Sequence, residues 1–550
     1  MTALLRRTMS GVAGLLGAGL GRLGATASLL GATALLLGAT LGLLACDPRE
    51  GADGRPPGQV AAPVFTVLAG SEVRDLESTL VQAAQAAGVT LELSYAGTLD
   101  IVDRVNAGEV FDAILPASGA YPSLALQRKP LAREKLFYSR VALGVVPAKM
   151  RELGWDRNTP SWAQIARAAG DGRLSFAMTN PASSNSGMSA LFAVASAVAG
   201  KTEDLAASEV DARVLTDFMK GQKLTAGSSG WLAEAYVKNP GMLDAMVNYE
   251  SVILRANAKL PDSARLIPLY PRDGVISADH PLMLLNEGRR ADYDKLVSAF
   301  KAPALQAQVA REAFLRPSLP GTPVASALSA APVAELAFPN RLEVMDAVLA
   351  SYLAQWRRPA TSIFVLDTSG SMKGQRIDDM RAALKVLAGA EPSGSASERY
   401  AAFQSRERVL LLTFSDRVAE PLQVTFEPTT MAAARQQVLN HANALQAAGG
   451  TAIYAALLRA QSLAREERRR DPGRYVSIVL LSDGENTAGP DFAAFRKAQT
   501  VAAAVRVFPV IFGEAPGEEM VELANLTGGR PFDARKASLA LVFKEIRGYQ

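Results

Sequence analysis

Short hydrophobic runs alternate with amphipathic stretches through two parts of the chain, residues 62–315 and 358–550. Each run has the length of a strand, and a polar loop and a helical pattern follow most of them. The candidate strands are 64–69, 90–95 and 174–178 in the first part, and 361–366, 409–414, 476–481 and 505–512 in the second, with 418–426 as an edge strand. Repeated strand, loop and helix predict two α/β domains with mainly parallel sheets, the second of them doubly wound.

The same pattern predicts the helices and the boundary between the two domains. The candidate helices are 72–87, 98–107 and 187–199 in the first domain, and 375–389, 431–447, 452–468, 491–504 and 536–547 in the second. Residues 316–340 are rich in Pro, Ala and Ser, which indicates a linker. A helix over 342–356 then leads into the second domain, so linker and helix together occupy residues 316–357.

Oxygen-bearing side chains follow three of the elements predicted in the second domain. Asp367, Ser369 and Ser371 alternate along the loop after the first strand, and Asp483 follows the strand 476–481. Thr451 stands in Gly449-Gly450-Thr451, where we expect it to cap the next helix. Doubly wound sheets bind ligands at the carboxyl ends of their strands, and oxygen ligands suit a hard cation such as Mg²⁺.

Together, Asp367, Ser369, Ser371, Thr451 and Asp483 resemble the metal-ion-dependent adhesion site of the von Willebrand factor A domain, over roughly residues 358–550. The resemblance implies a Rossmann-like doubly wound domain that holds Mg²⁺, or Mn²⁺ or Ca²⁺. The two serines would bind the ion directly, and Thr451 and Asp483 would bind it directly or through water. Asp367 would hold the loop and the bound waters, and an acidic side chain of a protein partner would complete the coordination. The alternative is a Rossmann-like domain with ordinary capping residues.

The first domain, residues 62–315, resembles a bacterial extracellular solute-binding protein of the two-lobed periplasmic type. The resemblance rests on Ala69–Ser71, Tyr95–Thr98, Phe176–Ser186 and Asn248–Ser251. It implies a second lobe over about 145–245, with crossings near 136–147 and 246–254, and a ligand held in the cleft between the lobes. The candidate ligand-binding residues are Ser71, Thr98, Ser184, Asn185 and Ser186. They suit a small polar or anionic solute, and the alternative is that they only cap helices.

Residues 1–45 have the pattern of a secretory signal: Arg6-Arg7, then no charge from Leu23 to Ala45. The end, Leu44-Ala45-Cys46-Asp47, resembles a bacterial lipobox, which implies lipidation of Cys46. An uncleaved transmembrane helix is the alternative, because 23 apolar positions can span a bilayer. Both interpretations place the rest of the chain outside the cytoplasm, anchored to a membrane through a flexible tether over 46–61. Asp47 favours the inner membrane.

Composition narrows the function classes. His280 and His441 are the only histidines in the sequence, which argues against histidine-based triads and zinc clusters. The formal charge of +4 lies mainly in the leader, because three arginines and no acidic residue precede Cys46. No nucleic-acid partner is therefore expected.

The leading interpretation is an extracytoplasmic binding protein whose second domain binds a protein partner through a divalent ion, gated by a solute in the first domain. The alternative is a solute receptor of a transport system, with the second domain as scaffold. An enzyme is least favoured, because the sequence shows no nucleophile–base signature or phosphate-binding loop.

Overall fold

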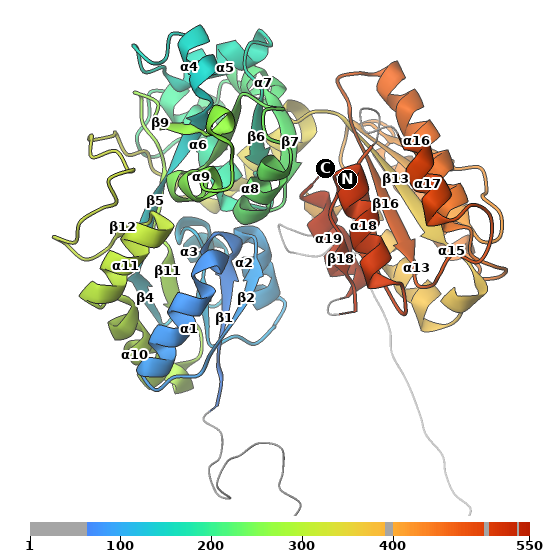
Figure 1. Cartoon of the computed structure of the whole chain (residues 1–550), viewed down its shortest axis with the longest axis horizontal. Helices are drawn as coiled ribbons and strands as arrows, with labels where there is room; N and C mark the ends of the chain where they lie inside the picture. The colour runs from blue at the N-terminus through green and yellow to red at the C-terminus, as the bar shows by residue number, and fades with distance from the viewer. Residues whose placement is uncertain (1–62, 391–399, 500–504, 536–537, 550) are drawn as a thin grey trace, which may run out of the picture. The chain divides into compact units, whose positions relative to one another are not determined.

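The structure is a computed structural model that describes residues 63–390, 400–499, 505–535 and 538–549 (Figure 1). The predicted leader and tether, including Cys46, lie outside these residues. Within the described ranges, no helix is long and apolar enough to cross a membrane.

The first lobe of the N-terminal domain is built on a sheet with the strand order β2-β1-β3-β11-β4. Its strands are β1 (Phe65–Gly70), β2 (Leu91–Ala96), β3 (Ala113–Leu115), β4 (Ala132–Lys135) and β11 (Pro281–Leu284). Its helices are α1 (Glu77–Ala86), α2 (Thr98–Asn106), α3 (Ala120–Ala125), α10 (Arg290–Phe300) and α11 (Pro303–Ala313), with a 3-10 helix, η1, over Ser71–Leu76. Strand β1 pairs in parallel with β2 and β3 and is almost wholly buried, as expected for a parallel strand covered on both faces.

The second lobe is built on a sheet with the order β10-β5-β8-β6-β7, and β9 and β12 also pair with β5. Its strands are β5 (Phe137–Val145), β6 (Phe176–Thr179), β7 (Gln222–Ala226), β8 (Ala245–Tyr249), β9 (Ile267–Leu269), β10 (Ser277–Ala278) and β12 (Arg316–Pro317). Its helices are α4 (Pro147–Glu152), α5 (Trp162–Gly170), α6 (Asn185–Val198), α7 (Ala212–Lys220), α8 (Ser229–Lys238) and α9 (Glu250–Asn257). Local signals set their starts: Ser161 and Gln164 form a capping box at α5, and Asp211 caps α7.

The second sheet is wider than the range 145–245 expected from the sequence. It takes in residues from Phe137 at the start of β5 to Ala278 at the end of β10. The chain returns to the first sheet at β11, and not near 246–254, where Tyr249 and Glu250 instead join β8 to α9. The reason is that β9 and β10 are two or three residues long and pair antiparallel with β5, so they carry little periodicity of their own.

Arg316–Pro317, at the start of the expected linker, form β12 of the second sheet, and residues 318–341 have little regular structure. Helix α12 (Leu342–Ser351) follows, and the chain continues into a π-helical turn over Tyr352–Trp356. This matches the helix expected over 342–356.

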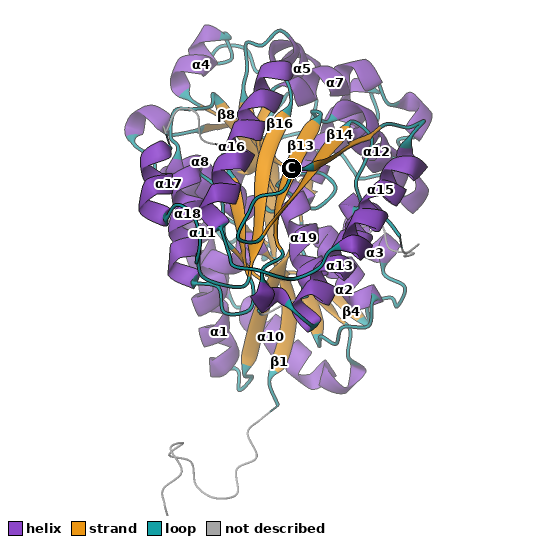
Figure 2. Cartoon of the chain, turned by 90° about the vertical axis from the view of Figure 1, so that its right-hand side faces the viewer, coloured by secondary structure: helices purple, strands orange, loops and turns teal. Residues whose placement is uncertain are grey.

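The C-terminal domain is a doubly wound sheet with the order β15-β14-β13-β16-β17-β18 (Figure 2). Its strands are β13 (Ala360–Asp367), β14 (Glu407–Phe414), β15 (Leu422–Phe426), β16 (Tyr475–Ser482), β17 (Val507–Ile511) and β18 (Phe532–Asp533). Its helices are α13 (Gln375–Ala388), α15 (Met431–Ala444), α16 (Ile453–Arg470), α17 (Phe492–Ala498), α18 (Gly517–Thr527) and α19 (Leu539–Arg547). Strand β15 is the antiparallel edge, and the other neighbours pair in parallel, which confirms the predicted fold class.

Helices cover both faces of this sheet. Phe364 and Leu366 of β13 pack in one hydrophobic cluster with residues of α13, α15 and α19. Ile363 and Val365, which alternate with them, pack in another cluster with residues of α16, α17 and α18. Strand β13 is therefore buried on both sides, and its carboxyl end is held rigidly between the two helical layers.

A buried ion group ties the ends of this domain together. Glu407, which starts β14, accepts hydrogen bonds from Arg357 and from Arg547 of α19, and all three side chains are buried. Burial raises the pKa of Glu407, but the attraction of Arg547 and Arg357 outweighs it, so the net shift is downward. A buried charge is stable only when paired in this way.

Candidate functional site

Asp367 stands at the end of β13 and holds its own loop to the neighbouring strand. Its side chain is fully buried, and Oδ1 accepts a hydrogen bond of 2.8 Å from the backbone N–H of Ser369. Its Oδ2 accepts one of 2.5 Å from the hydroxyl of Ser482, the last residue of β16. The carboxylate thus fixes the loop after β13 against the carboxyl end of β16.

Two hydroxyls and a second carboxylate continue from this loop. The Oγ atoms of Ser369 and Ser371 are 3.0 Å apart, and the Ser371 hydroxyl donates to Oδ1 of Asp483 over 2.8 Å. Asp367, Ser369 and Asp483 are buried, whereas Ser371 is exposed. The oxygen cluster therefore has a buried floor and one side open to solvent.

Thr451, the fifth predicted site residue, lies in a loop held against the first one. The N–H of Gly370 donates to the carbonyl of Gly449 over 2.9 Å. Thr451 is buried, and its N–H donates to the hydroxyl of Thr487 over 2.9 Å. Hydrogen bonds thus link four of the five predicted side chains, and the loop contact brings the fifth beside them.

The expectation that Thr451 caps the following helix is wrong. Helix α16 begins at Ile453, its N-cap is Ala452, and no side chain makes the capping bond. Instead, Oδ1 of Asn486 accepts from the N–H of Tyr454 over 3.5 Å. The Thr451 side chain is therefore not committed to the helix start.

Burial and an arginine set the charge of the site. Burial raises the pKa of Asp367, although the hydrogen bonds from Ser482 and Ser369 lower it in part. The guanidinium of Arg376, which is one-third exposed, pairs with Oδ2 of Asp483, and this bond raises the pKa of Arg376. An ion bound directly to Asp483 has to share that carboxylate with Arg376.

The donor set fits a hard divalent ion. Two carboxylates and three hydroxyls offer only oxygen, the ligand type of Mg²⁺, Mn²⁺ and Ca²⁺. Among the described residues, no group of three or more His, Cys, Asp or Glu side chains could hold a metal ion. An ion at this site would therefore depend on the hydroxyls of Ser369, Ser371 and Thr451 and on water.

Sequence reasoning missed Ser482, Arg376 and Thr487. Ser482 precedes Asp483 at the strand end, so its inward position follows from the alternation of side chains along β16. Arg376 and Thr487 carry no comparable signal, because contacts between separate loops decide where they point.

All five predicted cleft residues of the first domain are buried: Ser71, Thr98, Ser184, Asn185 and Ser186. Ser184 stands at the N-cap position of α6 but makes no side-chain capping bond, and the N-cap positions before Ser71 and Thr98 are glycines. The hydroxyl of Ser186 is engaged internally, at 2.9 Å from Oγ1 of Thr179 and 2.8 Å from Oγ of Ser229. Ser186 therefore supports the loop after β6 rather than facing a ligand.

Contacts across the cleft show that the two lobes are closed on each other. A Cβ on Gly97, in the first lobe, would lie 2.2 Å from the carbonyl oxygen of Ser183 in the second. The guanidinium of Arg255, in α9, donates over 2.8 Å to the carbonyl of Glu72 and over 3.0 Å to Oδ2 of Asp75, both in η1. The cleft residues are thus buried because the lobes cover them.

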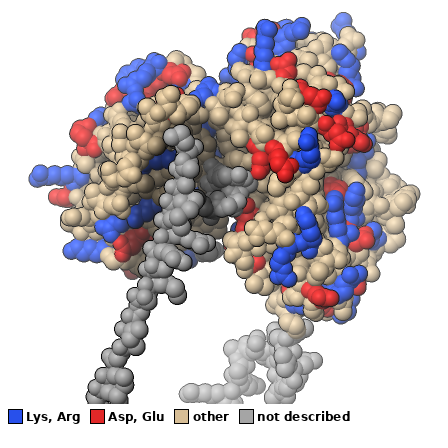
Figure 3. All heavy atoms as spheres, turned by 180° about the vertical axis from the view of Figure 1, so that it is seen from behind, with Lys and Arg blue, Asp and Glu red and all other residues tan. Residues whose placement is uncertain are grey.

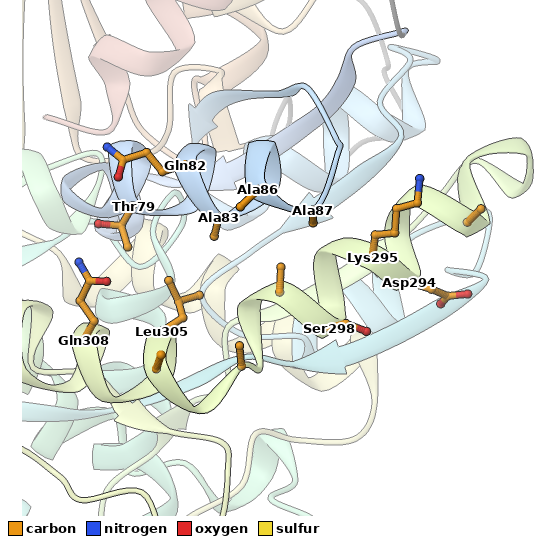
Figure 4. Close-up of a pocket in the computed structure, with 14 residues that line it drawn as sticks. Thr79, Gln82, Ala83, Ala86, Ala87, Asp294, Lys295, Ser298, Leu305 and Gln308 are labelled. Atoms are coloured by element: carbon orange, nitrogen blue, oxygen red, sulfur yellow. The ribbon is translucent and has the colours of Figure 1, made fainter.

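A separate groove lies on the first lobe, where α1 runs beside α10 and α11 (Figure 4). Its lining is largely alanine, with Gln82, Lys295 and Gln308 at the rim. None of its lining residues carries an unpartnered buried polar atom. It thus offers no polar group that calls for a ligand.

Charged groups on the surface are mixed. Lys and Arg side chains alternate with Asp and Glu side chains in small groups on the face seen in Figure 3. Many form ion pairs, such as Arg290 with Asp294 and Arg104 with Glu109.

Comparison with known proteins identifies both domains. Residues 65–314 match the family of bacterial extracellular solute-binding proteins, and residues 362–485 match the von Willebrand factor type A domain. Inter-alpha-trypsin inhibitor heavy chain H4 of Sus scrofa is 33% identical over 134 residues, which are 24% of this chain and 13% of that protein. An uncharacterised protein of Mycobacterium tuberculosis is 33% identical over 129 residues, 24% of this chain and 18% of that protein. The chain thus spans less than a fifth of the length of these relatives.

Solved structures similar to the chain are periplasmic binding proteins. The periplasmic binding protein AfuA of Actinobacillus pleuropneumoniae has a TM-score of 0.42 and 11% identity, covering 53% of this chain and 97% of its own. A periplasmic thiamin binding protein has a TM-score of 0.43 and 14% identity, covering 54% and 97%. By the two family matches, residues 65–314 are similar to bacterial extracellular solute-binding proteins and residues 362–485 to von Willebrand factor type A domains.

Proposed function

We propose that the protein is a membrane-tethered, extracytoplasmic binding protein whose C-terminal domain binds a protein partner through a divalent ion. The observation that carries the proposal is the oxygen cluster at the ends of β13 and β16, buried at its floor and open at Ser371. When bound, the ion would supply a positive centre that attracts a carboxylate of the partner.

Each residue of the cluster has a distinct role in this proposal. Ser369 and Ser371 would bind the ion directly, and Thr451 and Asp483 would bind it directly or through water. Asp367 would hold the loop and orient bound water, as its bonds to the Ser369 N–H and the Ser482 hydroxyl suggest. The matched families are binding families, in line with a role in recognition rather than catalysis.

The first domain adds a solute to this scheme. A solute that closes the lobes would gate the binding of the partner, or the protein would serve as a solute receptor of a transport system with the C-terminal domain as scaffold. The closed contacts at Gly97 and Arg255 favour a working cleft in either case. The extracellular solute-binding family favours a location outside the cytoplasm, with Cys46 as the lipid anchor.

A crosslinking pull-down from envelope extract tests the partner claim. The full chain is used as wild type, as Asp367→Ala, and as Asp378→Ala, a control in which an exposed carboxylate of α13 is removed. In Mg²⁺, wild type and Asp378→Ala should retain the same partner, and Asp367→Ala should lose it by about tenfold or more. Retention that is equal in EDTA, or equal in Asp367→Ala, would rule the proposal out.

A further inference from the structure

A buried carboxylate of the first lobe has one oxygen without a hydrogen-bond partner. Glu72 follows β1 in the first lobe; its side chain is 7% exposed, and its Oε1 has no hydrogen-bond partner. The carboxylate folds back over Gly70, where a Cβ would lie 2.0 Å from Oε1. Gly70 therefore makes room for the Glu72 carboxylate at the end of a parallel strand.

Polar atoms without partners also lie in the second lobe and in the segment between β10 and β11, close to Tyr249. Nδ2 of Asn185 donates to the hydroxyl of Tyr249 over 2.8 Å, while its Oδ1 has no partner. The ring of His280 is 6.0 Å from that of Tyr249, and neither of its nitrogens makes a hydrogen bond of standard geometry, although the backbone of Phe137 interacts with the ring. The charge of Glu72 acts on the Tyr249 hydroxyl, where it adds to the effect of burial in raising that pKa.

Buried polar atoms in proteins are nearly always paired, with protein or with a bound molecule. Glu72, Asn185 and His280 are each more than nine-tenths buried, and they come from both lobes and the segment between them. Such a set of unsatisfied atoms at strand ends of both lobes is expected where a solute binds. All three side chains group around Tyr249, which makes this part of the fold a candidate solute site.

The charges select the kind of ligand. The cationic side chain that acts on Glu72 is Arg255, but its guanidinium is engaged by Asp75 and by the carbonyls of Glu72 and Ala313. It is therefore not free to bind an anion. Burial lowers the pKa of His280 to about 4, although Asp279 raises it in part, so its ring is neutral near pH 7. An anionic ligand would meet the Glu72 carboxylate without a compensating charge.

We propose that the cleft binds a small organic cation that bears an N–H donor, an amine whose ammonium group pairs with Glu72. The inference rests on the solute-binding part of the proposed function, and it replaces the small polar or anionic solute expected from the loop hydroxyls. Tyr249 and His280 would pack against the carbon skeleton, and Asn185 would accept a further hydrogen bond.

Thermal unfolding of the full chain in EDTA tests this with named probes. One set of samples contains methylamine, ethanolamine or putrescine hydrochloride, and the other contains sodium phosphate, sulfate or molybdate. Each salt is added at about 10 mM, which is high enough to saturate a weak site. We expect at least one amine to raise the Tm of wild type by several degrees. Glu72→Gln, which keeps the shape and removes the charge, should lose that rise. Glu234→Gln, an exposed control on α8, should keep it.

Several outcomes would overturn the proposal. The first is a rise in Tm with an oxyanion. The second is a rise in Tm with an amine that persists in Glu72→Gln, and the third is no rise in Tm with any of the three amines. A rise with Mn²⁺ that depends on Glu72 would assign the cleft to a metal ion instead. Stabilisation by Mg²⁺ is measured in the same variants. If Glu72→Gln loses the Mg²⁺ stabilisation, the variant has a folding defect. If it keeps the Mg²⁺ stabilisation, a lost amine effect comes from the cleft alone.

Discussion

Two buried carboxylates, Asp367 and Glu72, follow the carboxyl ends of parallel strands, but their surroundings differ. Asp367 accepts hydrogen bonds from its own loop and from Ser482, so it holds a preformed cluster. Oε1 of Glu72 has no partner, so only the backbone N–H of Glu72 and the charge of Arg255 offset its burial. Burial raises the pKa of Glu72 to about 7, even though its own backbone N–H and Arg255 lower it.

The raised pKa of Glu72 predicts how the unliganded protein responds to pH. The folded state holds the Glu72 proton up to about pH 7, and the unfolded state releases it near 4.5. The contribution of Glu72 to the free energy of unfolding therefore falls as pH rises from 4.5 to 7, by up to about 3 kcal/mol. His280, Arg255 and Tyr249 are common to wild type and Glu72→Gln, so their effects cancel in the difference.

Urea unfolding of both proteins between pH 4.5 and 8 measures that difference. Glu72→Gln should gain stability relative to wild type as pH rises, and the gain should level off above pH 7. A difference that does not change with pH would mean that the Glu72 carboxyl is not destabilised by burial.

At the scale of elements, the loops after β2 and β6 decide whether the lobes can close. Gly97 has an ordinary backbone conformation, so alanine there adds no backbone strain. Its Cβ, however, would lie 2.2 Å from the carbonyl oxygen of Ser183. The close approach of the two loops thus requires a glycine for reasons of space.

Gly97→Ala should therefore weaken closure. Overpacking of this kind costs about 1–3 kcal/mol, which corresponds to about a 5- to 150-fold loss of affinity for the amine that stabilises wild type. Gly288→Ala is the matched control, because the nearest atom to its Cβ would lie 3.4 Å away. Calorimetric titration of both variants measures the effect. Equal affinities would show that the closed contact at Gly97 is not part of the bound state.

The elements show what the sequence can predict and where it stops. The strands β13, β14, β16 and β17 are buried on both faces, so continuous hydrophobic runs revealed them within a few residues. Strands β9, β10 and β18 have only two or three residues each, and pairing with distant residues, not local pattern, creates such short strands. Helix α18 was not predicted either. The five residues of the proposed metal site follow one another in an order along the chain that resembles a known motif, which made them recognisable. Glu72, Tyr249 and His280 come from distant parts of the chain, and only the fold brings them together.

At the scale of the whole molecule, the two domains each carry a site at the carboxyl ends of parallel strands. One site is an oxygen cluster open on one side, and the other is a closed cleft with an unpaired carboxylate. The two proposals assign different ligands to them, a divalent ion and an organic cation, so the two sites can be tested separately. Both α/β domains thus place side chains at the carboxyl ends of parallel strands, and the identity of those side chains decides what each site binds.

The most direct test of the central claim is the Tm of the full chain in Mg²⁺ against EDTA. An ion that binds the folded state alone raises Tm, so wild type and Asp378→Ala should be stabilised by Mg²⁺, and Asp367→Ala should not. The same series with Mn²⁺ and Ca²⁺ ranks the ions. If wild type has the same Tm in Mg²⁺, Mn²⁺, Ca²⁺ and EDTA, or if Asp367→Ala keeps the stabilisation, the oxygen cluster at Asp367 is not a metal site.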